Sequence, residues 1–272
     1  FTPTENEDEA TILGIIACSV RQKGIDKVYS RIKKWNEMKD RKNCITFVSG
    51  CILPADRERF LKLFDLVFTM NDLPDLPDMI RQYGIVVPTR QQSIDNIQQP
   101  IVNIQRPLVP LFNKKDKINP SANMDRFWVI EPDHISDFEA FIPIQNGCNK
   151  FCTYCAVPYT RGREVSRKSE EILDELKELV QKDYKIITLL GQNVNSYGLD
   201  KKGEEINFAE LLRRIGEYGN SVDKEFWVYF TSPHPRDMSD EVIEVISQYK
   251  CLAKQIHLPI QSGDNAMLDR MN

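Results

Sequence analysis

No hydrophobic run in the 272-residue chain approaches the roughly 20 apolar residues that a transmembrane helix needs. A secretory signal peptide is not visible at the N-terminal end either. These two absences argue against a membrane protein, and we expect a cytoplasmic location. Because the chain begins with Phe1 and not with Met, we expect its authentic N-terminus to lie upstream.

An excess of positive charge is also missing. The 36 Lys and Arg residues are outnumbered by 40 Asp and Glu residues, which gives a net charge of −4. This balance argues against a protein that coats nucleic acid through bulk charge, so any nucleic-acid contact must come from a local basic patch. We interpret the basic stretch at residues 31–42 as a solvated helix face. The length is sufficient for two domains with hydrophobic cores of their own.

Cysteine is scarce and unevenly placed. Seven cysteines are too few for a disulfide scaffold in a chain of this length, and their grouping is typical of ligands in a reducing compartment. Three of them, Cys148, Cys152 and Cys155, fall within eight residues in the run GCNKFCTYC. This spacing supplies three thiolates from one loop.

Three thiolates suit an iron–sulfur cluster better than a structural zinc ion. A cubane cluster has four irons, so three cysteines leave one iron open to a small molecule. Structural zinc usually takes four protein ligands from two separated pairs, and no second pair lies near this loop. The loop therefore predicts a catalytic cluster with one open coordination position.

The first part of the chain alternates strand and helix patterns. Apolar runs of strand length occupy residues 10–18, 43–51 and 65–69, and a charged helical stretch follows the first run at residues 21–39. Apolar strands that alternate with helices predict a parallel sheet covered on both faces. The sequence thus predicts an α/β domain at residues 1–87.

Residues 88–126 break this pattern. They are rich in Gln, Asn and Pro and show no sustained period, which is typical of a linker. A second alternation occupies residues 127–272. It predicts strands at residues 141–145, 186–190, 226–230 and 256–260. It also predicts helices with Ser169 and Ser239 as their N-caps, one around residues 208–218, and the start of another at the C-terminal end. Four such units predict a partial (β/α) barrel.

Polar residues follow each predicted strand of the second domain. Since a parallel α/β barrel places its active site at the carboxyl ends of its strands, these residues are expected to form a rim around the cysteine loop. The polar residues on this rim include Gln192, Asn193, Ser232 and Gln261, and because all four predicted strands end in this way we favour a functional role for the set. The alternative is that each of them is an ordinary turn residue.

Cys18 and Cys51 end the first two predicted strands, so both are expected at the carboxyl edge of the first sheet, where α/β proteins place ligands. The alternative is two inert core cysteines. Two thiolates alone hold a cubane poorly, and this stretch supplies no third. Cys44 lies at the opposite end of its strand, and Cys251 precedes a barrel strand, so we interpret both as small buried hydrophobic residues.

Four segments together resemble a known family: GCNKFCTYCAVPYTRGREVSR, LLGQNVNSYG, FTSPHP and HLPIQSGDNAMLDRMN. They are similar to the radical S-adenosylmethionine methylthiotransferases, and most similar to the MiaB type that acts on transfer RNA. The segments ACSVRQKG and SGC resemble the second and third cysteine motifs of that family's N-terminal domain. The resemblance covers residues 10–72 and 127–272.

The resemblance implies a flavodoxin-like or Rossmann-like N-terminal domain and a radical SAM barrel. It implies that Cys148, Cys152 and Cys155 ligate the radical [4Fe–4S] cluster, with Tyr154 beside the bound cofactor S-adenosylmethionine. On this reading, the candidates for holding the methionine and ribose ends of that cofactor are Gln192, Asn193, Ser232 and Gln261. It also implies that Cys18 and Cys51 are two of three ligands of an auxiliary [4Fe–4S] cluster. The family's first cysteine motif and its C-terminal TRAM domain are expected outside this chain.

The implied reaction adds a methylthio group to C2 of N6-isopentenyladenosine next to the anticodon. The deoxyadenosyl radical would remove the C2 hydrogen, the auxiliary cluster would supply sulfur, and a second S-adenosylmethionine would supply the methyl group. Expected partners are the transfer RNA anticodon loop and an electron donor such as flavodoxin or ferredoxin, and we expect a monomer. The basic residues after the cysteine loop are candidates for RNA phosphate contacts, the alternative being a solvated approach to a helix. They are Arg161, Arg163, Arg167 and Lys168.

Three alternatives remain open from the sequence. The first is a sibling methylthiotransferase that acts on threonylcarbamoyl-adenosine transfer RNA or on a ribosomal protein. The second is a non-catalytic RNA-binding module stabilised by zinc. The third is a chain that is inactive by itself although its parent is a transferase.

Overall fold

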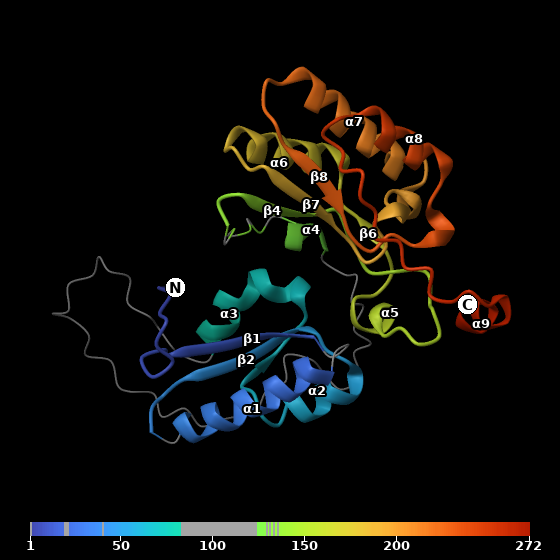
Figure 1. Ribbon diagram of the computed structural model, residues 1–272. Helices are drawn as coiled ribbons and strands as arrows, with labels where there is room; N and C mark the ends of the chain where they lie inside the picture. Colours follow the sequence, from blue (N-terminus) through green and yellow to red (C-terminus); the bar gives the residue numbers. More distant parts are fainter. Residues whose placement is uncertain are drawn as a thin grey trace. The chain divides into compact units, whose positions relative to one another are not determined.

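Two parallel sheets, one in each of two units, organise the computed structural model of this chain (Figure 1). The structure describes residues 2–18, 22–39, 41–82, 124–128, 130, 132, 134 and 136–272. The units are residues 1–118 and residues 119–272. Most of the predicted linker lies outside the described residues, and a short helix, α4 (Met124–Trp128), begins within its last three residues. Among the described residues, no helix combines the length and apolar character that crossing a membrane requires.

The sheet of the first unit has the strand order β1-β2-β3, and all its pairs are parallel. Its strands are β1 (Ile12–Cys18), β2 (Ile45–Cys51) and β3 (Leu66–Val67). The first two strands pair along their whole length, from Ile12 opposite Ile45 to Cys18 opposite Cys51. The two apolar runs therefore form the strands that the sequence predicted, and both end in cysteine.

Helices cover both faces of this sheet, as predicted. α1 (Gln22–Lys39) and α2 (Pro54–Phe60) pack on one face, while the 3-10 helix η1 (Met70–Asp75) and α3 (Leu76–Gln82) pack on the other (Figure 1). Helix α1 buries apolar residues at helical spacing against the strands because they share one side of the helix. They are Ile25, Val28, Ile32 and Trp35.

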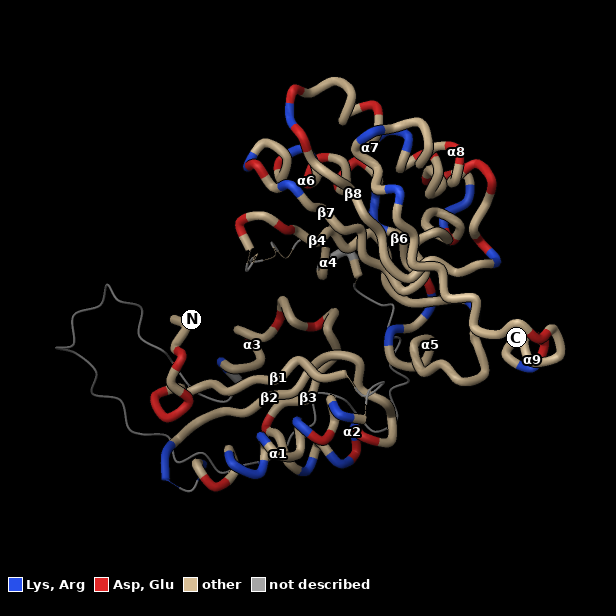
Figure 2. The backbone as a smooth tube through the Cα atoms, in the orientation of Figure 1, with Lys and Arg blue, Asp and Glu red and all other residues tan. Residues whose placement is uncertain are grey.

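The basic stretch at residues 31–42 is only partly the solvated face that the sequence suggested. Figure 2 shows charges of both signs along α1 and α2. Some of the basic residues in this stretch form ion pairs or hydrogen bonds with the N-terminal segment. Arg31 and Lys34 form ion pairs with Glu7, and Lys42 donates from Nζ to three backbone carbonyls between residues 7 and 10. The side chain of Lys39 is 5% exposed and forms an ion pair at 2.6 Å with Asp65, the residue before β3. The stretch therefore fastens the N-terminal segment to the unit.

The sheet of the second unit has the order β4-β7-β8, again parallel throughout. Its strands are β4 (Glu139–Pro143), β7 (Ile186–Leu190) and β8 (Trp227–Phe230). Helices α6 (Ser169–Gln181), α7 (Phe208–Ser221) and α8 (Asp240–Gln248) lie together on one face of this sheet (Figure 1). One-sided coverage by helices that alternate with parallel strands is the arrangement of a partial (β/α) barrel.

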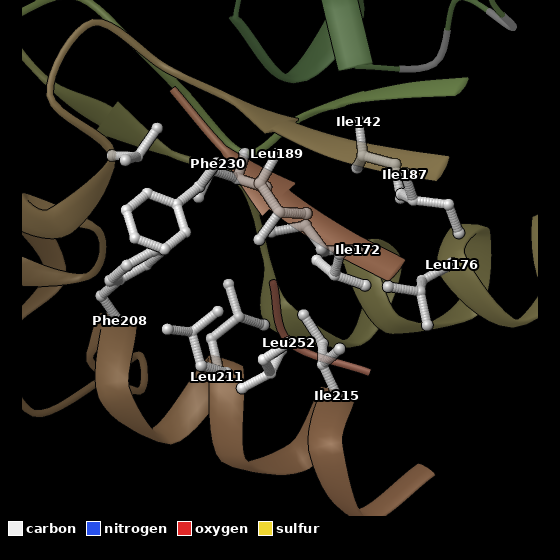
Figure 3. Packing of buried hydrophobic residues seen from close by; sticks show 14 of the residues in the cluster. Ile142, Ile172, Leu176, Ile187, Leu189, Phe208, Leu211, Ile215, Phe230 and Leu252 are labelled. Atoms are coloured by element: carbon white, nitrogen blue, oxygen red, sulfur yellow. The ribbon is translucent and has the colours of Figure 1, made fainter. Parts of the chain in front are cut away.

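Alternate strand residues point into the layer between this sheet and its helices. Figure 3 shows Ile187 and Leu189 of β7 facing Ile172 of α6 and Leu211 of α7, and all four are fully buried. Burying a side chain of this size stabilises the fold by about 1.5–3 kcal/mol relative to leaving it exposed. This layer fixes the strands, and the strands fix the positions of the loops at their carboxyl ends.

Two local predictions for this unit were wrong. Residues 256–260 form no strand; the chain instead makes a single parallel bridge between Val228 and Leu252. Pro259 cannot donate a backbone hydrogen bond, and Ile260 is 68% exposed, so the segment lacks both the bonding and the burial of a strand. Ser169 is the first residue of α6, and its predicted capping position belongs to Lys168.

Other predictions for this unit are confirmed. Ser239 caps α8, since its hydroxyl accepts from the backbone N–H of Val242 at 3.4 Å. The predicted C-terminal helix is α9 (Asn265–Met271).

The remaining elements all follow strands of the second unit. They are β5 (Gln145–Asn146), α5 (Val157–Thr160), β6 (Val165–Ser166), η3 (Val194–Ser196), η4 (Leu199–Lys201) and η5 (Pro235–Asp237). The first three come after β4, the next two after β7 and the last after β8. Short elements thus accumulate at the end of the sheet where ligands bind in this architecture.

Candidate active site

A two-stranded antiparallel ladder closes the loop that carries the three cysteines. Gln145 of β5 pairs with Ser166 of β6, so residues 147–164 form a loop with a fixed base. The backbone N–H of Cys148 donates to the carbonyl of Gly162 at 3.1 Å, which continues this ladder into the loop. Gly147 adopts a φ of +76°, a left-handed conformation that turns the chain toward the cysteines.

The three thiols lie near one another at the carboxyl end of β4. Cys148 is buried, while Cys152 and Cys155 are half-buried. Burial raises the pKa of the Cys148 thiol, and the charges of Glu164, Cys155 and Cys152 raise it further, whereas a hydrogen bond from the backbone N–H of Lys150 lowers it. These mutual effects show that the thiols are close enough to interact electrostatically.

The donor set fits an iron–sulfur cluster. Three sulfur donors from one loop are the ligands that such clusters take. In the part of the chain that the structure describes, no three Cys, His, Asp or Glu side chains converge on one point as the ligands of a single metal ion do.

Two residues predicted to bind the cofactor are in contact. The hydroxyl of Tyr154 donates to Oε1 of Gln261 at 2.9 Å, which joins the cysteine loop to the segment before α9. Burial raises the pKa of the Tyr154 hydroxyl, and the nearby charges of Cys152 and Cys155 add to this effect. Backbone bonds reinforce the junction, because Thr153 donates from its N–H to the carbonyl of Met271 at 3.0 Å.

Of the predicted rim residues, Gln192 and Asn193 follow β7 and Ser232 follows β8, whereas Gln261 follows no strand. Asn193 is buried; its Nδ2 donates to Asp237 at 2.7 Å, and its Oδ1 has no hydrogen-bond partner among the described residues. Gln192 is half-buried beside it. Ser232 and Gln261 are exposed and have positive φ values of 58° and 66°. Strained backbone of this kind tends to occur at functional sites, where the surrounding structure enforces it.

Sequence reasoning missed the ion pair that holds the cysteine loop to this rim. Lys150, which lies between the first two cysteines, contacts Asp237 of η5 at 2.6 Å. Both side chains are largely buried, at 15% and 12% exposure, and Asp237 also accepts from Asn193. The only signal in the sequence was a lysine inside the cysteine motif. Its partner lies 87 residues away, beyond the reach of local patterns.

Replacing Asp237 with Asn is expected to lower the free energy of unfolding by about 2 kcal/mol, because it leaves the Lys150 ammonium buried without a carboxylate. Urea denaturation measures this change. The matched control is Glu225→Gln, which removes one partner of the exposed pair with Lys250 and is expected to cost less than about 1 kcal/mol. Equal effects of the two substitutions would contradict the structural role of the buried pair.

The four basic residues after the cysteine loop differ in their surroundings. The guanidinium of Arg163 lies over the ring of Phe151, 4.4 Å from its centroid. The side chain of Arg167 is 11% exposed and forms ion pairs with two acids of α6, so a phosphate would have to replace these carboxylates. Lys168 is 69% exposed at the start of α6. Arg161 is half-buried and exchanges hydrogen bonds with Asn146.

In the first unit, the structure brings Cys18 and Cys51 together. They are direct partners at the ends of neighbouring parallel strands, whose backbones lie about 4.8 Å apart. Cys18 is half-buried and Cys51 is buried. Cys44 precedes β2 at the other end of the strand and packs against the hydrophobic cluster, as expected. In the second unit, Cys251 is buried in the core, also as expected.

Two family profiles match the chain. The profile described as "Radical SAM superfamily" matches residues 142–272, and the profile described as "Uncharacterized protein family UPF0004" matches residues 1–70. The first match begins in β4 and includes the cysteine loop and the rim. The second includes β1 and β2 with the paired cysteines at their ends.

Two bacterial relatives align with the whole chain, and both are named tRNA-2-methylthio-N(6)-dimethylallyladenosine synthase. The protein of Clostridium perfringens strain SM101 is 37% identical over 281 aligned positions, which cover 100% of this chain and 55% of the relative. That of Carboxydothermus hydrogenoformans is 36% identical over 278 positions, which cover 100% and 56%. The chain therefore spans about half the length of the curated relatives it matches.

A solved structure agrees in fold. The cobalamin-dependent S-adenosylmethionine radical enzyme OxsB, with aqua-cobalamin bound, aligns with a TM-score of 0.51 at 15% identity. The alignment covers 96% of this chain and 37% of that one. The chain therefore combines a radical SAM domain with a UPF0004 domain, and along its whole length it is similar to proteins named tRNA-2-methylthio-N(6)-dimethylallyladenosine synthase.

Proposed function

We propose that the protein to which this chain belongs adds a methylthio group to C2 of N6-isopentenyladenosine in transfer RNA, next to the anticodon. The relatives that align with the whole chain carry the name of this activity, the dimethylallyl group of that name being the isopentenyl group. The observation that carries the proposal is the three-cysteine loop, held at the carboxyl ends of parallel strands by the β5–β6 ladder.

The radical SAM domain implies a [4Fe–4S] cluster and S-adenosylmethionine as cofactors. When bound, they supply one-electron chemistry at a carbon that no side chain could activate. Cys148, Cys152 and Cys155 would hold the cluster. Asn193 offers the unpartnered Oδ1 as an acceptor for the amino or hydroxyl groups of the cofactor. Tyr154 and Gln261, already joined by a hydrogen bond, would form one wall of the cofactor site.

We further propose that Cys18 and Cys51 bind an auxiliary cluster that supplies the sulfur. Their pairing at the ends of β1 and β2 places two thiols at one edge of the sheet, where α/β proteins bind ligands. A third thiolate is needed to complete such a site, and we expect it from a part of the protein outside this chain.

The RNA substrate would approach over the basic residues near the loop. Exposed Lys168 and Arg163 suit contacts to phosphate, and Arg161 lies on the same segment. Arg167 could contact an RNA phosphate only after its ion pairs with the two acids of α6 have broken. Adenine at C2 is accessible only when the base is unstacked, which favours a single-stranded anticodon loop as the target.

The alternatives have less support. Neither relative described above is named for threonylcarbamoyl-adenosine or for a ribosomal protein. A zinc-stabilised RNA module would use a second pair of ligands beside the loop, and the sequence places no second pair of cysteines or histidines near it.

An assay of the whole protein tests the proposal. The protein, reconstituted with iron and sulfide and reduced with dithionite or flavodoxin, is expected to methylthiolate transfer RNA that contains isopentenyladenosine. Mass spectrometry of the digested RNA detects the product. Transfer RNA with unmodified adenosine at that position is the control. Product on threonylcarbamoyl-adenosine RNA or on a ribosomal protein alone would overturn the substrate, and a colourless protein with stoichiometric zinc would overturn the chemistry.

A further inference from the structure

Glu164 is a buried acid at the base of the cysteine loop. It immediately precedes β6, and the β5–β6 ladder encloses it so that only 7% of the residue is exposed. A carboxylate in such a position is costly unless other groups compensate it. The residues around it therefore decide what the charge does.

Neutral groups satisfy this carboxylate. Asn149 donates from Nδ2 to Oε2 of Glu164 at 3.3 Å. The hydroxyl of Ser196 lies 2.8 Å from both Oε1 of Glu164 and the carbonyl oxygen of Asn193, and it shares its one proton between them. Among the residues that the structure describes, no Lys, Arg or His lies within ion-pair distance of Glu164. The hydrogen bonds solvate the charge without cancelling it.

The same contacts connect Glu164 to the first cysteine. Asn149 follows Cys148 in the chain, and its Oδ1 accepts from the backbone N–H of Glu164 at 3.4 Å. On the other side of Glu164, the hydroxyl of Ser196 accepts a hydrogen bond from Nε2 of Gln145 in β5. The one cation within the cysteine motif, Lys150, is already neutralised by Asp237. Glu164 thus places a negative charge beside the loop that no ion pair among the described residues neutralises.

We propose that Glu164 is a positioning residue whose charge lowers the reduction potential of the cluster held by Cys148, Cys152 and Cys155. The inference rests on the proposed function, since it requires that cluster. Reduction adds one electron from a low-potential donor to the cluster, and no proton accompanies it. A fixed negative charge nearby disfavours this step, because the added electron is repelled in a poorly screened environment. A low potential in turn favours transfer of the electron onward to a sulfonium group.

The test is a potentiometric titration of the whole reconstituted protein with dithionite, followed by electron paramagnetic resonance. Cys18 and Cys51 are replaced by alanine in every sample, so that one cluster contributes to the signal. Glu164→Gln keeps the size of the side chain and an acceptor for Ser196. It is expected to raise the ratio of reduced to oxidised cluster about tenfold at a given potential, a shift of about 59 mV for one electron.

Three variants separate charge from structure. Glu164→Asp keeps the charge and is expected to restore the original potential. Ser196→Ala removes a hydrogen bond but leaves the charge, so its potential is expected to be unchanged. Glu178→Gln makes the same chemical change in an exposed pair with Lys182 on α6 and is also expected to leave the potential unchanged.

The possible outcomes differ clearly. An unchanged potential in Glu164→Gln, at full iron content, overturns the proposal. If that variant takes up no iron, the two variants that keep the charge decide: a changed potential in Glu164→Asp or in Ser196→Ala would show that local structure sets the potential and would overturn the proposal, whereas an unchanged potential in both supports it. Failure of the unsubstituted protein to bind iron would instead refute the proposed function.

Discussion

Replacing Cys152 with alanine in the whole protein is expected to abolish cleavage of S-adenosylmethionine. The loss should exceed about 10³-fold, which corresponds to a barrier raised by about 4 kcal/mol. The reason is that two thiolates from the loop cannot keep the cluster in place with one open iron. Cys152 is the better target than Cys148 because its side chain is half-buried, whereas that of Cys148 is packed in the structure. Iron and sulfide analysis and quantification of the released deoxyadenosine measure the effect.

The matched control for this substitution is Cys251→Ala. Cys251 is also a cysteine of the second unit, but it is buried in the core with its Sγ 3.9 Å from the carbonyl oxygen of Ile215. Its replacement is expected to lower stability by about 1 kcal/mol and to leave the iron content unchanged. Cys152→Ala with the iron content and cleavage rate of the unsubstituted protein would show that the loop holds no catalytic cluster.

Much of the fold was predictable because the chain carries strong local patterns. The runs ATILGIIAC and NCITFVSGC contain β1 and β2, with the strands beginning two residues inside each predicted start. Continuous apolar runs of strand length followed by charged helices leave few arrangements other than a parallel sheet between helices. The same reasoning predicted the three strands β4, β7 and β8.

The errors arose where pairing depends on residues far apart in the chain. The β5–β6 ladder consists of two residues on each side, too short to leave a periodic pattern, yet it closes the cysteine loop. The segment at residues 256–260 has the apolar composition of a strand, but the bridge to β8 forms earlier, at Leu252. The composition of a segment shows that it could form a strand. Only the fold shows whether a neighbouring strand has backbone N–H and C=O groups free to pair with it.

In the candidate site too, some residues could be found from local sequence patterns, whereas others gain their importance only from the fold. Spacing alone made the three cysteines candidates, and the end of a predicted strand that the structure contains did the same for Asn193, whereas Gln261 was chosen from a predicted strand that does not form. Lys150, Asp237 and Glu164 escaped notice because charged residues are common in loops and their meaning here comes from burial. A charged side chain inside a metal-ligand motif is nevertheless a useful signal, since a cluster's properties depend on nearby charge.

The conformation of Gly147 provides a second test with a large expected effect. A Cβ atom at this position would lie 2.1 Å from the carbonyl oxygen of Arg163 and 2.7 Å from that of Gly162. Both are backbone atoms, so relief requires the two sides of the loop base to separate. That movement would break the hydrogen bond from Cys148 to Gly162. Gly147→Ala is expected to lower the free energy of unfolding by about 3 kcal/mol.

The control for Gly147→Ala is Gly203→Ala, because the two glycines share a positive φ but differ in their surroundings. Gly203 has a φ of +89°, and no described heavy atom lies within 4 Å of its expected Cβ. Its substitution is expected to cost only the conformational strain, about 1 kcal/mol. Urea denaturation gives both values, and iron analysis should show a loss for Gly147→Ala alone. Equal values would mean that the loop base yields to a methyl group, and that the cysteines are held by the cluster more than by the fold.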